Sequence, residues 1–269
     1  MQYNPSMRSV FIAGARGRIG RELVRLAQAA DLALVDVPEA AAVCFLALPR
    51  TVVEKELQQW TAPASREQAV IDLSGAFKIH GVGNYGLVMG PRQLWGGIAI
   101  EDARLFANPG CIASAVICGL QRSGVKPSMR AGLHVTAVTA GSAAKTSTSG
   151  TVRTGLRWWD HPHVAEIESA TGLACASFIP VVDYALERGI IATISGTLEP
   201  DAPGLGDAAE QSIDVAEVQH TAELRWHRRL HTHPSLGTTF AVTAALDNLT
   251  FPAANAVRLA CEWLTARDA

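Results

Sequence analysis

Short hydrophobic runs alternate with amphipathic segments along the first part of the chain. Continuous apolar runs bounded by polar or turn residues are typical of parallel strands that are buried on both faces. We expect such strands at residues 9–13, 32–37, 42–48 and 69–73. Helical spacing occurs between them, at residues 21–30 and 51–60. Strands that alternate with helices predict an α/β fold with a Rossmann-type parallel sheet over about the first 110 residues.

The pattern changes in the second half of the chain. Apolar runs at residues 133–140, 174–182 and 189–199 have few clear helices between them, which predicts a mixed sheet in a second, α+β domain. A stretch rich in Gly, Ser, Thr and Ala follows the first run at 141–150, and residues 199–207 are a predicted surface loop. A last strand is expected at 240–246 and a last helix at 253–266.

A glycine turn joins the first predicted strand to the first predicted helix. Gly14, Gly17 and Gly20 have GxxGxxG spacing. In this context glycines allow a tight turn and bring a pyrophosphate against the free N–H groups of the helix. A tight turn without a ligand is the alternative, and the strand-to-helix context favours the nucleotide.

Two cues for the choice of dinucleotide conflict. Arg16 and Arg18 lie in the turn, where they are suited to the 2′-phosphate of NADP, although exposed arginines are usually only solvated. Asp36, near the end of the second predicted strand, is suited to the free ribose 2′-OH of NAD. The residues alone leave both cofactors open.

Cys111 differs from the other cysteines in its position. It follows Asn108-Pro-Gly and precedes an apolar helical run at 112–120, so its thiol lies near a helix N-terminus, where a thiolate is favoured. The odd number of cysteines and the lack of CxxC spacing fit neither a disulfide framework nor a zinc site. The remaining cysteines are interpreted as small buried hydrophobic residues: Cys44, Cys118, Cys175 and Cys261.

Two histidines lie close together before a predicted helix. His161 and His163 are followed by Glu166 and Glu168, which are suited to orient or charge an imidazole. A His-x-His pair is also half of a metal site, but no further ligands accompany it, so no metal is expected. The other close pair, in the basic stretch 225–233, is interpreted as part of a solvated face.

Composition and charge limit the classes of partner that the chain is expected to bind. The 269 residues are 48% hydrophobic and 18% charged, with a formal net charge of -2. This balance gives no reason to expect nucleic acid or an anionic membrane as a partner. No apolar stretch approaches the ~20 residues of a membrane-spanning helix, and the N-terminus has no signal-peptide pattern. The expected location is the cytoplasm.

Motifs spread over nearly the whole length carry a family resemblance. The most specific are Asn108-Pro-Gly-Cys111 and His161-Pro-His163 with Glu166-Ile167. With these, the chain resembles N-acetyl-gamma-glutamyl-phosphate reductases, in the aspartate-semialdehyde dehydrogenase superfamily. The other matching segments are residues 14–20, 45–49, 71–77, 85–87, 104–107, 141–145, 188–193 and 247–249.

The resemblance implies an enzyme of arginine biosynthesis that reduces an acyl phosphate to a semialdehyde with NADPH. Cys111 would form a thioester, and His163, preferred over His161, would be the acid or base. It implies cofactor contacts from Gly14, Ala15, Arg16, Gly17, Arg18, Ile19, Gly20, Leu48, Pro49 and Ser74. Substrate contacts are expected from Asn108, Ser142, Lys145, His161, Glu166 and Arg188.

The resemblance also implies an architecture. Residues 1–110 and 250–269 would form the dinucleotide-binding domain, and 111–249 the catalytic domain, through whose sheet family members assemble into dimers or tetramers. Departures from the family include a short segment between Gly20 and Val43, and Ile112-Ala-Ser after the cysteine. These departures indicate a compact, diverged member, whose acyl group is a close analogue or is attached to a carrier.

Two other functions stay open from the sequence. The first is a non-catalytic, nucleotide-binding regulatory protein of the same fold, which the short cofactor segment favours. The second is a reductase without covalent chemistry, for which Cys111 would be dispensable.

Overall fold

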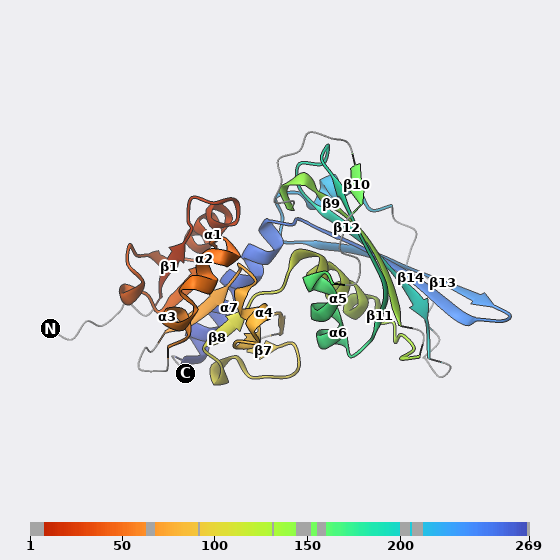
Figure 1. Ribbon diagram of the computed structural model, residues 1–269, viewed down its shortest axis with the longest axis horizontal. Coiled ribbons are helices and arrows are strands. Elements are labelled where there is room, and N and C mark those ends of the chain that lie inside the picture. Colours follow the sequence, from red (N-terminus) through yellow and green to blue (C-terminus); the bar gives the residue numbers. More distant parts are fainter. Residues whose placement is uncertain are drawn as a thin grey trace. The chain divides into compact units, whose positions relative to one another are not determined.

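The chain forms two compact units in the computed structural model, which describes residues 8–62, 68–90, 92–130, 132–143, 152–154, 160–199, 205 and 212–267 (Figure 1). Unit 1 comprises Met1–Gly110 and Pro252–Ala269, and unit 2 comprises Cys111–Phe251. Each unit has a sheet of its own.

Unit 1 contains a six-stranded sheet in the order β2-β1-β3-β4-β8-β5, in which every neighbouring pair is parallel. This confirms the predicted parallel α/β architecture. The strands are β1 (Ser9–Ala13), β2 (Ala33–Leu34), β3 (Val43–Leu46), β4 (Ala69–Asp72), β5 (Asn84–Tyr85) and β8 (Leu105–Ala107). A separate antiparallel pair consists of β6 (Val88–Gly90) and β7 (Gln93–Leu94).

Helices cover both faces of this sheet. Residues of β3 alternate between two hydrophobic clusters: Val43 and Phe45 belong to one, and Cys44 and Leu46 to the other. This double burial explains why β3 has a continuous apolar sequence. The helices are α1 (Arg18–Ala29), α2 (Arg50–Lys55), α3 (Leu57–Thr61), α4 (Ala76–His80) and α7 (Thr250–Arg267), with 3-10 turns η1 (Pro38–Ala40) and η2 (Ile100–Asp102).

Two predicted elements of unit 1 differ in the structure. The helix expected at 51–60 is divided into α2 and α3 at Glu56, whose backbone (φ -110, ψ 15) leaves the helical region. The strand expected at 32–37 pairs only over Ala33–Leu34, because it lies at the edge of the sheet and both residues are exposed.

Unit 2 contains a second six-stranded sheet, in the order β10-β11-β9-β12-β14-β13. The β9/β11 pair is parallel and the other pairs are antiparallel, so the predicted mixed sheet is confirmed. Its strands are β9 (Leu133–Ala140), β10 (Val152–Thr154), β11 (Cys175–Asp183), β12 (Ile190–Thr197), β13 (Leu224–His233) and β14 (Gly237–Leu246). Its helical elements are α5 (Cys111–Ser123), α6 (Pro162–Thr171), η3 (Gly141–Ala143) and η4 (Val215–Val218).

The two faces of this sheet have different surroundings. Helices α5 and α6 pack on one face, where Val135 and Ala137 of β9 are buried (Figure 1). On the opposite face His134 and Thr136 of the same strand are exposed. The alternation of buried and exposed residues along β9 therefore indicates that one face of the sheet is covered and the other is open.

The basic stretch 225–233 is largely the edge strand β13 rather than only a solvated surface. Its polar side chains hide the strand pattern, because no strand among the described residues pairs with its outer edge. The predicted loop at 199–207 and most of 141–150 lie outside the described residues. Within the described part of the chain, no helix has the length and hydropathy to cross a membrane.

Candidate active site

The glycine turn follows β1 directly and leads into α1. Gly14 has φ +86, and a Cβ there would lie 2.5 Å from the carbonyl oxygen of Ala47. A Cβ on Gly20 would lie 2.0 Å from the carbonyl oxygen of Gly14. Both positions thus require glycine for the turn to pack against the helix and the neighbouring strand.

The start of α1 fits an anionic group. Its N-cap residue, Gly17, provides no side-chain cap, and the first turn contains no acidic residue. The first backbone N–H groups of a helix have no intrahelical acceptor, and the helix dipole favours negative charge beside them. Arg16 and Arg18 are exposed in the same turn. These features are those of a phosphate-binding helix start.

The topology places this turn where a dinucleotide is expected. In the strand order, β1 lies between β2 and β3. The chain goes from β1 to β2 on one side and then to β3 on the other, so the direction of the chain across the sheet reverses between β1 and β3. Ligands of open α/β sheets bind outside the carboxyl ends of the strands at such a switch point. The glycine turn follows β1, and Leu48 and Pro49 follow β3.

Ser74 follows β4 at the same edge of the sheet. Its Oγ is 2.6 Å from Oδ1 of the buried Asp72, and it accepts a hydrogen bond from the backbone N–H of Ala76 at 3.1 Å. Asp72 also accepts from the backbone N–H of Phe77 at 2.8 Å. The hydroxyl of Ser74 is therefore part of the turn that begins α4.

Cys111 is the first residue of α5 and is partly exposed. Its side chain is hydrogen-bonded to that of His163, near the start of α6. The other cysteines differ in their surroundings. Burial raises the pKa of the Cys118 and Cys175 thiols to about 11, and it also raises the pKa of Cys261.

His163 connects the cysteine to a buried carboxylate. Its Nδ1 lies 3.0 Å from Oε2 of Glu166, one helical turn further along, which leaves Nε2 for Cys111. The side chains of His163 and Glu166 are 17% and 4% exposed. Burial opposes the charge on the imidazole. However, the hydrogen bonds and negative charges of Cys111 and Glu166 outweigh it and raise the pKa of His163 to about 9.

His161 contacts His163 without taking its place at the cysteine. It is the N-cap residue of α6, and its Nδ1 accepts a hydrogen bond from the backbone N–H of His163 at 3.2 Å. Its ring also contacts Phe178 of β11. Phe178 could not be assigned to the site from the sequence, because only the folding of the sheet brings β11 to this helix.

Three residues expected to bind substrate are engaged with other side chains. Asn108 donates to the carbonyl of Pro252 at 3.2 Å and accepts from Asn255 at 2.8 Å. The hydroxyl of Ser142 accepts from Asn248 at 2.9 Å.

Arg188 is the third of these residues. It is buried, and its Nε lies 2.9 Å from Oδ2 of Asp247. It also donates to Thr250 at 2.8 Å and contacts Nδ1 of His220 at 2.9 Å. Hydrogen bonds from Arg188 and from backbone N–H groups outweigh burial and lower the pKa of Asp247. The remaining candidate, Lys145, lies outside the described residues.

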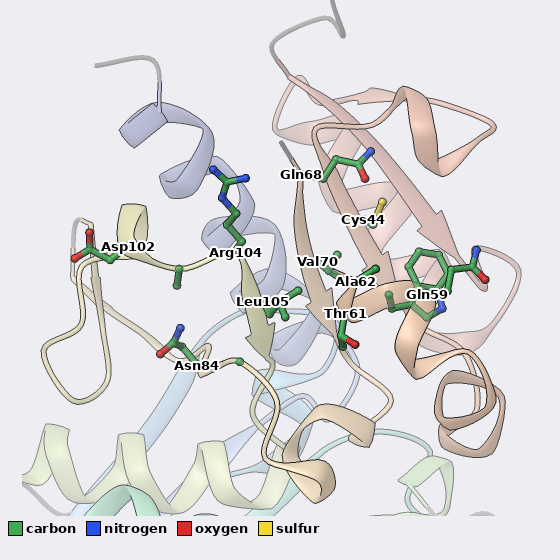
Figure 2. A pocket seen from close by; sticks show the side chains of 13 residues that line it. Cys44, Gln59, Thr61, Ala62, Gln68, Val70, Asn84, Asp102, Arg104 and Leu105 are labelled. Carbon is green, nitrogen blue, oxygen red and sulfur yellow. The ribbon is translucent and has the colours of Figure 1, made fainter. Parts of the chain in front are cut away.

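A cavity of about 300 Å³ lies elsewhere in unit 1, at the amino ends of β3, β4, β5 and β8 (Figure 2). Trp60, Thr61, Asn84 and Arg104 contribute to its lining. It contains none of the residues predicted for catalysis or cofactor binding. The described residues contain no cluster of three or more His, Cys, Asp or Glu that could hold a metal.

Comparison with known proteins assigns the family. No family model matches the chain. The N-acetyl-gamma-glutamyl-phosphate reductase of Salinispora arenicola is 31% identical over 243 residues, covering 82% of this chain and 68% of the relative. The chain belongs to the N-acetyl-gamma-glutamyl-phosphate reductase family. A relative with the same name, from Salinispora tropica, is 36% identical over 146 residues, which span only 41% of its length.

Solved structures of aspartate-semialdehyde dehydrogenases have a fold similar to that of this reductase family member. Aspartate semialdehyde dehydrogenase II of Vibrio cholerae, complexed with ASA, has a TM-score of 0.70 at 13% identity, covering 97% of this chain and 98% of that chain. A probable aspartate-semialdehyde dehydrogenase of Pseudomonas aeruginosa has a TM-score of 0.68 at 15% identity, covering 97% and 99%. The family comprises oxidoreductases that depend on NAD or NADP and act on small molecules.

Proposed function

We propose that this protein reduces N-acetyl-gamma-glutamyl phosphate, or a close analogue, to the semialdehyde with NADPH, through a thioester on Cys111. The hydrogen-bonded series Cys111, His163 and Glu166 carries the proposal. A nucleophile, an imidazole and an orienting carboxylate in this order form the arrangement that covalent catalysis requires. As an enzyme of arginine biosynthesis, it would work in the cytoplasm.

The first chemical step belongs to Cys111. Its thiolate attacks the carbonyl carbon of the acyl phosphate, a C–S bond forms, and the C–O bond to phosphate breaks. Inorganic phosphate leaves with the bonding electrons. The protonated imidazole of His163 stabilises the thiolate before attack, and backbone N–H groups at the start of α5 are suited to stabilise the oxyanion.

The protonated imidazole of His163 acts in the later steps. With its pKa raised to about 9, it is an imidazolium at neutral pH. It donates a hydrogen bond to the oxyanion formed when the thioester is reduced, and it stabilises the thiolate that leaves as the aldehyde forms. Glu166 occupies Nδ1, so Nε2 is the ring nitrogen that remains to act on the reacting sulfur.

The glycine turn and the start of α1 are the residues suited to hold the dinucleotide pyrophosphate. A nicotinamide dinucleotide bound there supplies the hydride for the reduction. We favour NADP over NAD because Arg16 and Arg18 are both exposed beside the turn. Asp36 is exposed as well, so the preference is tested by comparing the dissociation constants of NADPH and NADH for the same protein.

We also propose that the open face of the unit 2 sheet binds a second copy of the chain. Thr136, Thr193 and Thr243 lie in one row across β9, β12 and β14, and the first two are exposed. Short uncharged side chains over several strands form a flat surface on which a second sheet can pack. Light scattering of wild type and Thr193→Arg tests this, with a dimer or larger assembly expected only for wild type.

The reverse reaction tests the proposed function. The protein is incubated with N-acetylglutamate semialdehyde, inorganic phosphate and NADP, and formation of NADPH is followed. Cys111→Ala is compared with Cys118→Ala, a matched change further along the same helix. Turnover that requires phosphate and is lost only in Cys111→Ala supports the proposal.

Other outcomes separate the alternatives. Turnover that survives in Cys111→Ala would identify a reductase without covalent chemistry. Cofactor binding without turnover on this substrate or its aminoadipate analogue would direct the search to carrier-bound acyl groups. A protein that binds neither cofactor would be the non-catalytic, regulatory form of the fold.

A further inference from the structure

The ring of His161 is in contact with two other aromatic rings. Its centroid lies 4.8 Å from that of His163, at an interplanar angle of 35°, and 5.0 Å from that of Phe178, at 31°. Phe178 is fully buried in β11. His161 therefore connects the ring of His163 to a fixed part of the unit 2 core.

His161 also caps the helix that carries His163. Pro162 occupies the first helical position, and Nδ1 of His161 accepts from the backbone N–H of His163 at 3.2 Å. Asn, Asp, Ser and Thr are the usual residues for this role. None of them would provide an aromatic ring against His163, so capping alone does not account for a histidine here.

The hydrogen bond fixes the protonation of His161. An imidazole nitrogen accepts a hydrogen bond only through its lone pair, so Nδ1 is unprotonated and the ring proton lies on Nε2. Protonation of Nδ1 would remove the cap and place a second cation beside the imidazolium of His163. The cap and the ring contact thus both require a neutral His161.

We propose that His161 is a positioning residue, whose neutral ring and N-cap hold the imidazole of His163 between Cys111 and Glu166. This inference rests on the proposed function of that site. It assigns the two histidines different roles: His163 stabilises the charges that form on the sulfur and the oxyanion, and His161 keeps the ring of His163 in place. It also separates His161 from the substrate contacts expected of it.

Alkylation of Cys111 tests this role without substrate or cofactor. The full chain is treated with iodoacetamide, and modification of each cysteine-containing peptide is followed by mass spectrometry. The readout is the rate for Cys111 at about pH 7 divided by its rate at about pH 10, where thiols are largely ionised without assistance. Because an unfolded chain has an unassisted thiol and a low ratio, the ratio is measured only on variants whose circular dichroism spectrum matches wild type.

Two variants separate the cap from the ring. His161→Asn keeps a capping oxygen but removes the ring, and His161→Phe keeps a ring but removes the cap. His233→Asn is the matched control, because Nδ1 of His233 also accepts from a backbone N–H two residues later, that of Ser235 at 3.1 Å. His233 is exposed at the end of β13, where the hairpin turns.

We expect the ratio to fall about ten-fold in His161→Asn, the change that one pH unit makes to the ionised fraction of a weak acid. We expect a smaller fall, about three-fold, in His161→Phe, because the ring contact is kept. His233→Asn should match wild type. If one of the His161 variants does not fold, the other decides the outcome.

Ratios within two-fold of wild type in the folded His161 variants would overturn the positioning role while leaving the proposed function intact. A low ratio in wild type, unchanged by His163→Gln, would show that no assisting pair exists. That result would overturn both the proposed function and the role of His161.

Discussion

The glycine turn of unit 1 and the cysteine–histidine pair of unit 2 are constructed in opposite ways. The turn depends on the absence of side chains, since a Cβ on Gly20 would lie 2.0 Å from the carbonyl oxygen of Gly14. The pair depends on the presence of particular side chains, Cys111 and His163, on two different helices. Binding of the dinucleotide and covalent chemistry should therefore respond independently to mutation.

Loss of the nucleophile should have the largest effect. In Cys111→Ala the sulfur that forms the thioester is absent, so we expect kcat to fall by at least about 10³-fold. The dissociation constant for NADPH, measured by fluorescence titration, should stay within about two-fold of wild type, because the glycine turn is unchanged. A variant that loses NADPH binding as well would contradict the independence of the two regions.

Glu166→Gln should have the next largest effect. The variant keeps the size of the side chain but removes the negative charge beside Nδ1 of His163, 3.0 Å away. We expect kcat to fall by about 10²-fold and the alkaline limb of the pH–rate profile to move to lower pH. The direction follows from the loss of one of the partners that raise the pKa of His163.

Glu168→Gln is the control for that variant. Glu168 accepts a hydrogen bond from the backbone N–H of Cys175 at 2.8 Å rather than from a histidine. Its variant should keep the wild-type pH profile. An identical profile for both variants would show that Glu166 does not act through His163.

Gly20→Ala should have the opposite effect to Cys111→Ala, with cofactor binding weakened and the reactivity of Cys111 retained. The added Cβ has no space against the backbone of Gly14, so the turn must shift. We expect affinity for NADPH to fall by about ten-fold or more, with the pH 7 alkylation rate of Cys111 retained. Gly81→Ala, where a Cβ would meet nothing within 4 Å but φ is +62, controls for backbone strain away from the turn.

The smallest effect concerns the pH dependence of stability. The pKa of His163 is raised from 6.5 to about 9 in the folded chain. Its contribution to stability is full below the unfolded value and is lost as the pH rises through about 9, because the folded state then keeps a proton that the unfolded state has released.

Urea unfolding between about pH 6 and pH 9.5 measures this contribution, with a slope of at most about 1.4 kcal/mol per pH unit. His163→Gln should have a flatter profile over the same interval. A free energy of unfolding that rises with pH in the wild type, by an amount that His163→Gln lacks, would contradict the raised pKa.

Sequence patterns predicted the local parts of both regions. The glycine spacing, the position of Cys111 before an apolar helical run, and the separation of His163 from Glu166 are all short-range features. Each depends on a single turn of chain, and the structure places Nδ1 of His163 beside Glu166 as helical spacing allows.

The parts that sequence reasoning missed depend on long-range packing. Phe178 reaches His161 only because β11 pairs with β9 in the unit 2 sheet. The ion pair between Arg188 and Asp247 was not predicted, because only the β12/β14 pairing brings the two residues together. Strand β13 was hidden by its polar sequence, and only its partner β14 identifies it as a strand.

Detection of the covalent intermediate tests the central claim most directly. The protein is incubated with N-acetylglutamate semialdehyde and NADP without phosphate, and the cysteine-containing peptides are analysed by mass spectrometry. Oxidation of the thiohemiacetal on Cys111 should leave an acyl thioester on that residue alone, and addition of phosphate should release it as the acyl phosphate. Phosphate-dependent turnover with no adduct on Cys111, or with an adduct on another cysteine, would contradict the account.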